Sequence, residues 1–111
     1  MPGVPADVVL VLSTVPDDAS VEALARALID ERLAACVNVH APMVSIYRWK
    51  GAVERDSERQ LVIKTTRAAL PALEKRLREL HPYELPEFIV VEASGGSEKY
   101  LHWVVQEVQE A

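Results

Sequence analysis

The sequence is poor in cysteine and has no long apolar run. Cys36 is the single cysteine among 111 residues, so no disulfide can form within the chain. A lone thiol is typical of proteins in a reducing compartment, and we expect a cytoplasmic protein. No stretch approaches the roughly 18 consecutive apolar residues of a membrane-spanning helix, and no signal-type segment precedes Asp7. We therefore predict no membrane partner.

Positive charge is also scarce. The chain has 12 Lys and Arg residues against 17 Asp and Glu residues, which gives a formal net charge of -5. General nucleic-acid binders carry clustered positive charge, so we predict no nucleic-acid partner. Half of the residues are apolar, which is enough for a packed core at this length. We expect one domain over residues 1–111, with a loose N-terminal tail at residues 1–6.

The common catalytic and cofactor motifs are absent. The sequence has no glycine-rich phosphate loop, no G-x-S-x-G, no H-E-x-x-H and no cysteine pair at metal spacing. We therefore expect a protein without enzymatic activity. An acid–base enzyme that uses His81 with Glu84 or Glu87 is the least favoured alternative, since no second reactive group accompanies them.

The sequence does contain a regular alternation of strand and helix patterns. Apolar runs predict strands over residues 8–13, 36–49, 52–66 and 88–93. Apolar residues at helical spacing predict three helices. The first starts within residues 14–19, the second runs from residues 67–70 to residue 80, and the third follows Ser97. Thr14 and Asp17 have capping-box spacing before the first helix, and His81 before a proline ends the second. Pro42 predicts a bulge or an edge position within the second strand.

The longest predicted feature is a hairpin from Ser45 to Thr66. Gly51 supplies the positive φ that a tight turn at Lys50-Gly51 requires. A strand from Cys36 to this turn spans roughly 50 Å at 3.3 Å per residue. A helix of about 14 residues spans only roughly 21 Å. The hairpin is thus longer than the helices that cover it, and we expect its far end to pack against another copy of the chain.

The order β-α-β-β-α-β with an added C-terminal helix is typical of the ferredoxin-like split βαβ sandwich, an α+β fold. Right-handed crossovers place both main helices on one face of a four-stranded antiparallel sheet. The second strand then lies at an edge of the sheet, where a long strand needs a partner.

Four single residues are candidates for a site. Cys36 is either a nucleophile or soft metal ligand, or, as we favour, a buried strand thiol. His81 follows the second helix; it either binds a metal or moves a proton, or it caps the helix. His40 and His102 have no partner at ligand spacing, and we expect structural or exposed roles for them.

Three carboxylates form a further candidate. Glu54, Asp56 and Glu58 share one strand parity, so their side chains are predicted on one face of the hairpin. They form either a cation site or, as we favour, a solvated face with Arg55 and Arg59 nearby.

Three parts of the chain together resemble the CutA family of divalent-cation tolerance proteins. They are E-R-L-A-A-C-V-N-V at residues 31–39, S-I-Y-R-W-K-G at residues 45–51 with Glu58 and V-I-K-T-T at residues 62–66, and H-P-Y-E-L-P-E at residues 81–87. The resemblance covers residues 8–105. It implies a homotrimer of ferredoxin-like subunits, related in shape to PII-type signalling proteins, in which the hairpin makes much of the subunit contact. It also implies a role in tolerance of copper and other divalent metal ions.

The resemblance implies a metal site from which this chain departs. Well-known members have a cysteine at the end of the first strand and a histidine pair before Pro-Tyr, whereas this chain has Ser13 and Leu80 there and keeps only His81. A serine hydroxyl is a poor ligand for a soft ion, and leucine cannot bind one. We therefore expect His81 and Glu58 to be the remaining metal residues, with weak or altered binding of a divalent cation such as copper. The alternative is a PII-like sensor that binds a small molecule in clefts between subunits.

Overall fold

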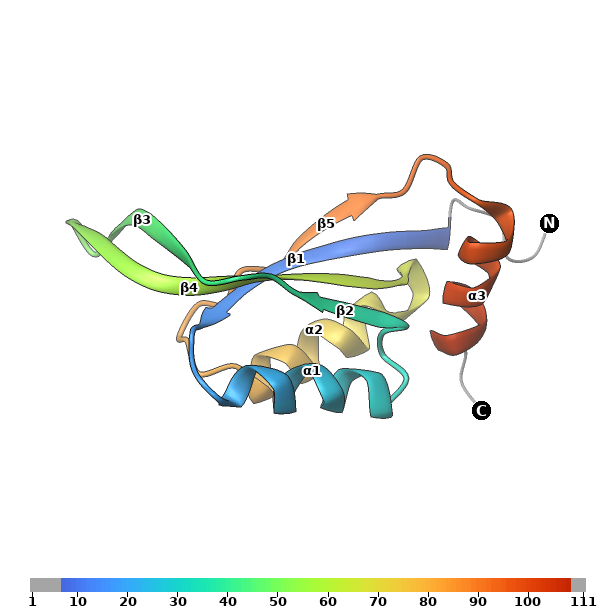
Figure 1. The fold of residues 1–111 in the computed structure, drawn as a ribbon, viewed down its shortest axis with the longest axis horizontal. Coiled ribbons are helices and arrows are strands. Elements are labelled where there is room, and N and C mark those ends of the chain that lie inside the picture. The colour runs from blue at the N-terminus through green and yellow to red at the C-terminus, as the bar shows by residue number, and fades with distance from the viewer. Residues whose placement is uncertain (1–6, 109–111) are drawn as a thin grey trace.

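The computed structural model describes residues 7–108, and the predicted tail at residues 1–6 lies outside them. A five-stranded antiparallel sheet carries two helices on one face and a third helix near one end (Figure 1). The strands are β1 (Val8–Pro16), β2 (Cys36–Val39), β3 (Met43–Trp49), β4 (Ala52–Thr66) and β5 (Ile89–Glu92). The helices are α1 (Ser20–Asp30), the short 3₁₀ turn η2 (Arg67–Ala69), α2 (Leu70–Leu80) and α3 (Glu98–Val108). None of the helices within residues 7–108 has the length and apolarity needed to cross a membrane.

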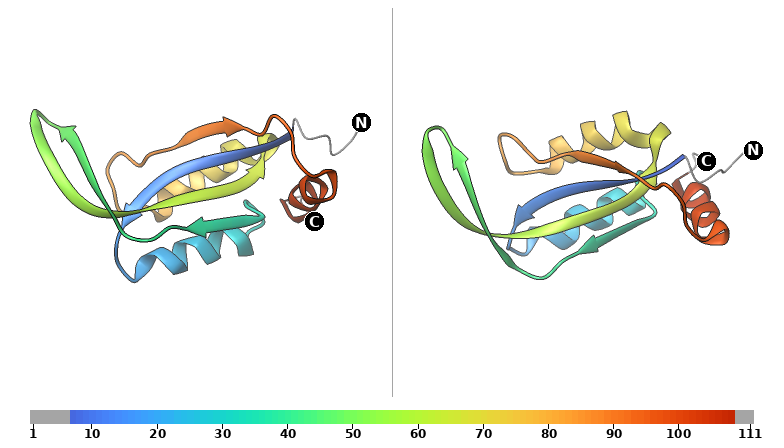
Figure 2. Two further views of the ribbon diagram at one scale, coloured as in Figure 1. Left: turned by 45° about the horizontal axis from the view of Figure 1, so that its top comes forward. Right: turned by 90° about the horizontal axis from the view of Figure 1, so that it is seen from above.

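The strands lie in the order β2-β4-β1-β5, and β3 pairs with the other half of β4. β4 therefore lies between β1 and β2, and β1 lies between β4 and β5, so each βαβ unit is interrupted by a strand of the other. Both main helices cover one face of this sheet, as the views in Figure 2 confirm. The predicted antiparallel α+β arrangement is confirmed, but the sheet has five strands rather than four.

The fifth strand arises because the predicted strand over residues 36–49 is two strands. β2 ends at Val39, and β3 begins at Met43, with Pro42 in the gap. Proline has no N–H to give to a ladder, so pairing with β4 is interrupted there. Both pieces pair only with β4, so the edge position predicted for this part of the chain is confirmed.

The predicted start of the first helix is wrong. β1 continues to Pro16 and pairs with β4 along its whole length, so Thr14 is a strand residue opposite Gln60 and caps nothing. The N-cap position is Ala19, and the carboxylate of Asp18 before it accepts from the N–H of Ser20 at 2.8 Å and from the Ser20 hydroxyl at 2.6 Å. Pairing of nine residues of β1 with β4 stabilises the strand more than one capping interaction would stabilise a longer helix.

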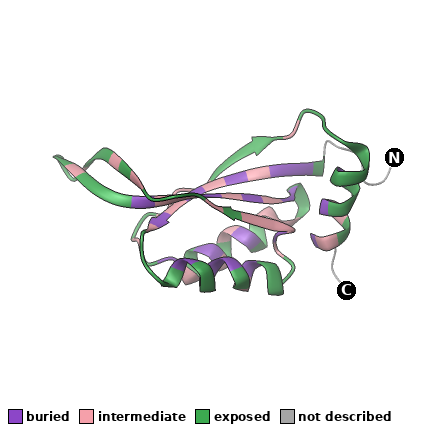
Figure 3. Ribbon diagram, in the orientation of Figure 1, coloured by how far each residue is buried: buried purple, intermediate pink, exposed green. Residues whose placement is uncertain are grey.

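The core lies between the helices and the sheet. α1 and α2 each bury a stripe of apolar side chains, which packs on the alternate residues of β1 and β4 that face them; Figure 3 shows this buried layer. The buried members are Val11, Val15, Val21, Leu24, Leu28, Ala34, Leu61, Ile63, Leu73 and Leu77. Burial of this kind contributes about 1.5–3 kcal/mol for each large side chain.

The β3–β4 hairpin runs past the ends of both helices, as predicted (Figure 1). Its turn has positive φ at both central residues, 50° at Lys50 and 84° at Gly51. This is the pattern of a type I′ turn, whose twist matches that of the two strands. The hairpin contributes to a longest molecular dimension of 49 Å, about twice the other two at 26 and 24 Å.

Candidate functional site

His81 is buried at the point where α2 ends, and both of its ring nitrogens are engaged. Nδ1 lies 3.1 Å from the backbone N of Tyr83, and Nε2 lies 2.7 Å from the carbonyl oxygen of Thr14. A backbone N–H can only donate and a carbonyl can only accept, so Nδ1 accepts and Nε2 carries the proton. The geometry therefore assigns the neutral Nε2–H tautomer, with no nitrogen lone pair left over.

Glu58 is buried on β4, and Tyr83 covers it from the segment after α2. The Tyr83 hydroxyl donates to Glu58 Oε2 at 2.7 Å. Loss of solvent around the phenol, together with this bond, raises the pKa of Tyr83 well above its usual range. Tyr83 thus joins the two residues that the sequence nominated, with its N–H on His81 and its O–H on Glu58.

Further polar contacts fix residues 82–88 against the sheet. Gln60 Nε2 donates to the Ser13 carbonyl oxygen at 2.7 Å and to Glu87 Oε2 at 3.2 Å. Glu84 lies 3.6 Å from Lys50 at the hairpin turn, where both side chains are largely exposed. Glu84 thus contacts the hairpin and Glu87 contacts β4. Within residues 7–108, the hydrogen-bond partners of the His81 ring are Thr14 and Tyr83, so neither glutamate forms an acid–base pair with it.

Ser13 lies on the face of β1 that meets the helices, between the core residues Val11 and Val15. Its side chain is fully buried, and Ser13 Oγ has no hydrogen-bond partner among the described residues. An unpaired buried hydroxyl destabilises the folded state. Leu80, the other position where the chain departs from the family pattern, is half-buried and packs against the core.

The donors at this site do not form a ready metal cage. Glu58 offers a carboxylate, but His81 can bind a metal only by giving up one of its two hydrogen bonds. Within residues 7–108, no three His, Cys, Asp or Glu side chains are grouped closely enough to hold a metal ion. A tight site for a transition metal usually requires three or four such ligands. The metal role of His81 and Glu58 stays a prediction.

The three carboxylates of the hairpin lie on one face, as predicted. In the ladder, Glu54 and Asp56 stand opposite Tyr47 and Ser45, on the same side as Glu58. The Tyr47 hydroxyl donates to Asp56, and this bond raises the pKa of Tyr47 to about 12. The favoured interpretation as a solvated face is wrong for Glu58, which is buried, whereas Asp56 is exposed and Glu54 is half-buried. Arg55 and Arg59 are neighbours in the chain but have the opposite parity.

The remaining candidates lie apart from this site. Cys36 lies on β2 opposite Lys64, so its predicted strand position is confirmed, but it is half-buried rather than buried. His40 and His102 are exposed, as expected.

Tyr83 and Gln60 are the residues that sequence reasoning missed. Tyr83 is part of the H-P-Y-E-L-P-E motif at residues 81–87. A tyrosine in a proline-rich segment does not by itself indicate contact with Glu58, which is 25 residues earlier in the chain. No local signal indicated this contact, because the parity of Glu58 groups it with Glu54 and Asp56 on the predicted solvated face. Its burial depends on the position of Tyr83, whose hydroxyl donates to it.

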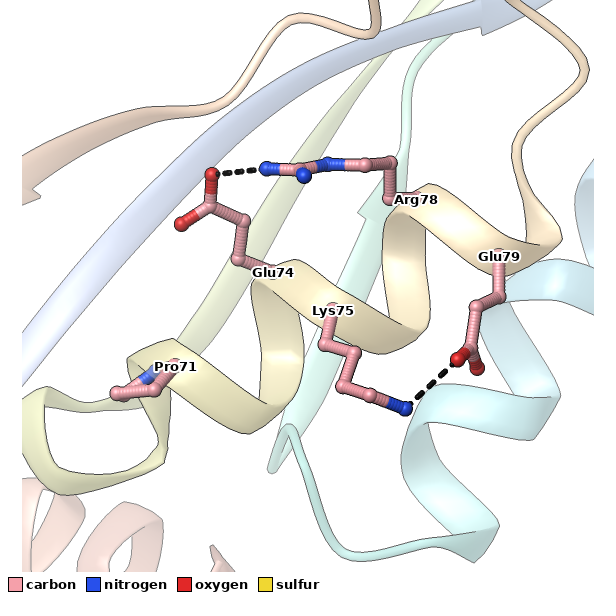
Figure 4. Close-up of a pocket in the computed structure, with 5 residues that line it drawn as sticks. All are labelled: Pro71, Glu74, Lys75, Arg78 and Glu79. Carbon is pink, nitrogen blue, oxygen red and sulfur yellow. Dashed lines mark hydrogen bonds and ion pairs between the residues drawn. The ribbon is translucent and has the colours of Figure 1, made fainter.

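Surface hollows also lie elsewhere on residues 7–108. Figure 4 shows one on the outer side of α2, where Glu74 pairs with Arg78 and Lys75 pairs with Glu79, both at 2.8 Å. Its charges are matched one turn apart, which is typical of a solvated helix face. The second, of about 700 Å³, lies between the η2–α2 region and α3. Neither hollow is lined by His81, Glu58 or Tyr83.

Comparison with known proteins relates most of the chain to one family. The family model described as CutA1 divalent ion tolerance protein matches residues 9–107. The divalent-cation tolerance protein CutA of Thermus thermophilus is 45% identical over 95 residues, which are 86% of this chain and 92% of that protein.

Solved structures of CutA proteins also resemble this chain. The crystal structure of CutA from Xylella fastidiosa superposes with a TM-score of 0.89 at 48% identity, and covers 93% of this chain and 99% of that one. A structure described as a PII-like protein CutA from Nostoc in apo form superposes with a TM-score of 0.84 at 38% identity, and covers 91% and 97% of the two chains.

Proposed function

Because the chain belongs to the CutA1 family of divalent ion tolerance proteins, we propose that it acts as a homotrimer in tolerance of divalent metal ions, copper among them. In this proposal the protein catalyses no reaction, and its own binding of metal ions is weak or altered. The cytoplasm remains the expected compartment.

The observation that carries the proposal of weak metal binding is the state of His81. Both ring nitrogens are already committed, one to the Tyr83 N–H and the other to the Thr14 carbonyl. A metal ion would have to displace one of these bonds in a buried place, where a lost hydrogen bond costs about 1–3 kcal/mol. Ser13 adds only a neutral hydroxyl on the core side of β1. The role in tolerance then rests on assembly and partners rather than on a tight metal centre.

The surface of the single chain supports assembly. All four residues of β5 are exposed, and Ile89, Val90 and Val91 keep 51%, 38% and 41% of their surfaces in solvent. Among residues 7–108, β5 pairs with β1 alone, so its other edge has no ladder partner within that range. An apolar strand of this kind is a hazard for a monomer and is suited to contact with another subunit.

A second candidate is a sensor of a small molecule, and the likeness to the structure described as a PII-like protein favours it. On this alternative, the Tyr83–Glu58 pair lines a cleft that a second subunit completes. A ligand that binds only the folded protein raises its unfolding midpoint by an amount that grows with ligand concentration. A metabolite-dependent rise, absent with copper, would favour the sensor over the proposed function.

Calorimetric titration with Cu(II) tests the proposed metal behaviour. Wild type, His81→Ala and the control His102→Ala, which alters an exposed helix residue, are titrated under the same conditions. We expect weak heats that differ little among the three proteins. Strong binding by wild type that disappears only in His81→Ala would contradict the proposal. Light scattering on the same wild-type sample is expected to give a mass near three chains, and a stable folded monomer would refute the trimer.

A cellular experiment tests the role itself. A strain that lacks its own CutA protein is grown across a copper series with and without this chain. We expect the chain to restore growth, and His81→Ala to restore it as well as wild type does. No restoration by wild type, at normal expression, would contradict a role in copper tolerance.

A further inference from the structure

The hollow between α3 and the η2–α2 segment, called the α3 hollow below, is separate from the candidate site around His81. α3 lies at the opposite end of the sheet from the hairpin turn (Figure 1). Among the described residues that border the hollow, none belongs to the hairpin or to residues 81–88. Its volume of about 700 Å³ is within the roughly 300–1,000 Å³ of small-molecule sites.

Thr66 borders the α3 hollow with a buried hydroxyl that has no partner. In the ladder Thr66 pairs with Val8, which packs on α3, so the Thr66 side chain is on the α3 face of the sheet. Thr66 is 8% exposed, and its hydroxyl makes no hydrogen bond within residues 7–108. Ser13 is sealed within the core, whereas Thr66 borders a space that a ligand can enter. A hydroxyl in such a place indicates a partner from outside the chain.

The start of the η2–α2 segment borders the same hollow and is uncapped. Thr66 holds the N-cap position of η2 with an extended backbone, but its side chain does not cap, and neither does Ala69 before α2. Neither first turn contains an acidic residue. Backbone N–H groups at a helix start have no partner within the helix and carry partial positive charge. Ala68 and Ala69 border the hollow, so these donors lie beside the Thr66 hydroxyl.

The charges around the α3 hollow favour a ligand with one negative charge. Arg32 borders the hollow, and its guanidinium donates to the carbonyl oxygen of Gln106 on α3 at 2.9 Å. Its φ of 58° is at the position after α1 where glycine is the usual residue. Glu31 is paired with Arg76 at 2.8 Å. Asp7 forms no ion pair within residues 7–108, so it would repel a second negative charge on a ligand.

The remaining wall of the α3 hollow is aliphatic. Leu33 after α1, Ala72 on α2 and Val105 on α3 contribute apolar surface from three parts of the chain. None of the described residues that border the hollow is aromatic. A nucleotide base would therefore find no ring to stack on, whereas a short hydrocarbon chain would have aliphatic surface on three sides.

We propose that the α3 hollow binds a small aliphatic monocarboxylate. The ligand carboxylate accepts from the Thr66 hydroxyl and from the N–H groups at the start of the η2–α2 segment, beside the positive charge of Arg32. The hydrocarbon chain of the ligand lies against Leu33, Ala72 and Val105. This inference goes beyond the proposed role in metal tolerance, since it requires neither a metal ion nor a second copy of the chain.

Titration of the whole chain with hexanoate, followed by amide NMR shifts, tests this site. Hexan-1-ol has the same hydrocarbon chain without the charge, and inorganic phosphate has charge without the hydrocarbon chain. We expect saturable hexanoate shifts that gather at residues 66–69. We expect binding roughly 10-fold weaker or more for both comparison compounds, because each lacks one part of the ligand. Absence of saturable shifts at residues 66–69, or equal binding by either comparison compound, would overturn the inference.

Thr66→Val keeps the shape of the side chain and removes its hydroxyl. We expect hexanoate affinity to fall roughly 10-fold, because a hydrogen bond to a charged group is lost. Thr65→Val is the matched control, since Thr65 is equally buried and its hydroxyl already donates to the Leu33 carbonyl oxygen. The control is expected to keep the wild-type affinity, and circular dichroism checks the folding of both variants. Equal affinity in Thr66→Val and wild type would overturn the inference.

A second pair of variants keeps both threonines, so it gives a result even if Thr66→Val does not fold. Ala72→Glu places a carboxylate in the first turn of α2, at an exposed position, where it competes with the ligand for the helix start. We expect hexanoate affinity to fall roughly 10-fold or more. Ala23→Glu makes the same change at an exposed position of α1 and is expected to leave affinity unchanged. Unaltered binding in Ala72→Glu would contradict the site.

Asp7→Asn tests the charge of the ligand. We expect hexanoate to bind roughly two-fold more tightly, because an exposed negative charge beside the hollow is removed. Weaker binding of hexanoate in this variant would overturn the assignment of a monocarboxylate.

Discussion

Tyr83 packs on His81 and also donates to it: the ring centroids are 4.7 Å apart, and the Tyr83 backbone N–H reaches His81 Nδ1 at 3.1 Å. The same tyrosine donates its hydroxyl to Glu58. The residue that links the two nominated metal ligands therefore also occupies one lone pair on each of them. A substitution at Tyr83 is therefore expected to change the stability of the folded protein more than it changes metal binding.

Tyr83→Phe is expected to destabilise the folded protein by about 1–3 kcal/mol, since the buried carboxylate of Glu58 loses its hydrogen-bond donor. Urea unfolding at neutral pH measures this, with all samples at one protein concentration because assembly shifts apparent stability. Tyr100→Phe is the matched control: Tyr100 is exposed on α3, and its hydroxyl makes no hydrogen bond within residues 7–108. Equal midpoints for the two variants would show that the Tyr83–Glu58 bond contributes nothing.

Alkaline pH should weaken the hairpin through Tyr47. The bond to Asp56 raises the pKa of Tyr47 to about 12, so the folded protein keeps a phenol proton that the unfolded chain loses near pH 10. The stabilisation is fully present below about pH 10 and is lost as the pH rises through about 12. Asp56→Ala should bring the tyrosinate absorbance of Tyr47 to lower pH, whereas Asp30→Ala on α1 should not. An unaltered titration in Asp56→Ala would refute the assigned cause.

The unpaired hydroxyl of Ser13 predicts a stabilising substitution. Ser13→Ala removes a buried polar atom that has no partner among the described residues, and we expect a gain of about 1 kcal/mol in the free energy of unfolding. Thr65 provides the contrast, because its equally buried hydroxyl donates to the Leu33 carbonyl oxygen at 2.7 Å. Thr65→Val, which keeps the shape, should cost about 1–2 kcal/mol. Thermal and urea unfolding measure both effects. A lower free energy of unfolding in Ser13→Ala would mean that the hydroxyl has a hydrogen-bond partner in solution.

The stability of the hairpin turn is expected to depend on backbone conformation and not on side-chain contacts. Gly51→Ala places a Cβ in open space, but at a φ of 84°, so we expect a loss of about 1–2 kcal/mol from the left-handed backbone. Gly95→Ala is the control, since its Cβ also meets nothing within 4 Å and its φ is not in the left-handed region. Lys50→Asn should be neutral or stabilising, because asparagine tolerates positive φ and the exposed Lys50–Glu84 pair contributes little. Equal stability of Gly51→Ala and Gly95→Ala would contradict this account.

The sequence predicts this fold well where a local pattern and the long-range pairing agree. Leu73 and Leu77 at helical spacing gave the buried stripe of α2, and Lys50-Gly51 gave the turn. Prediction failed where distant partners decide the outcome. Thr14 has the chemistry of a helix cap, but pairing with Gln60 keeps it in β1.

The sequence indicated two residues of the site but not how they are arranged. His81 and Glu58 were expected together from the family resemblance, but nothing local indicated that one tyrosine would contact both. The burial of Glu58 likewise depends on the path of residues 82–88 across β4, which is a property of the tertiary structure.

β4 pairs with three of the other four strands, and this has a consequence for how the chain folds. The β3–β4 hairpin is local and can close within microseconds, whereas the β1–β4 ladder joins opposite halves of the chain and must wait for loop closure. During synthesis, the exposed valines and isoleucine of the hairpin therefore appear before a second copy of the proposed trimer could cover them. Newly made protein should depend on rapid encounter with its own copies, and its yield should be limited by aggregation of early chains rather than by the stability of the finished fold.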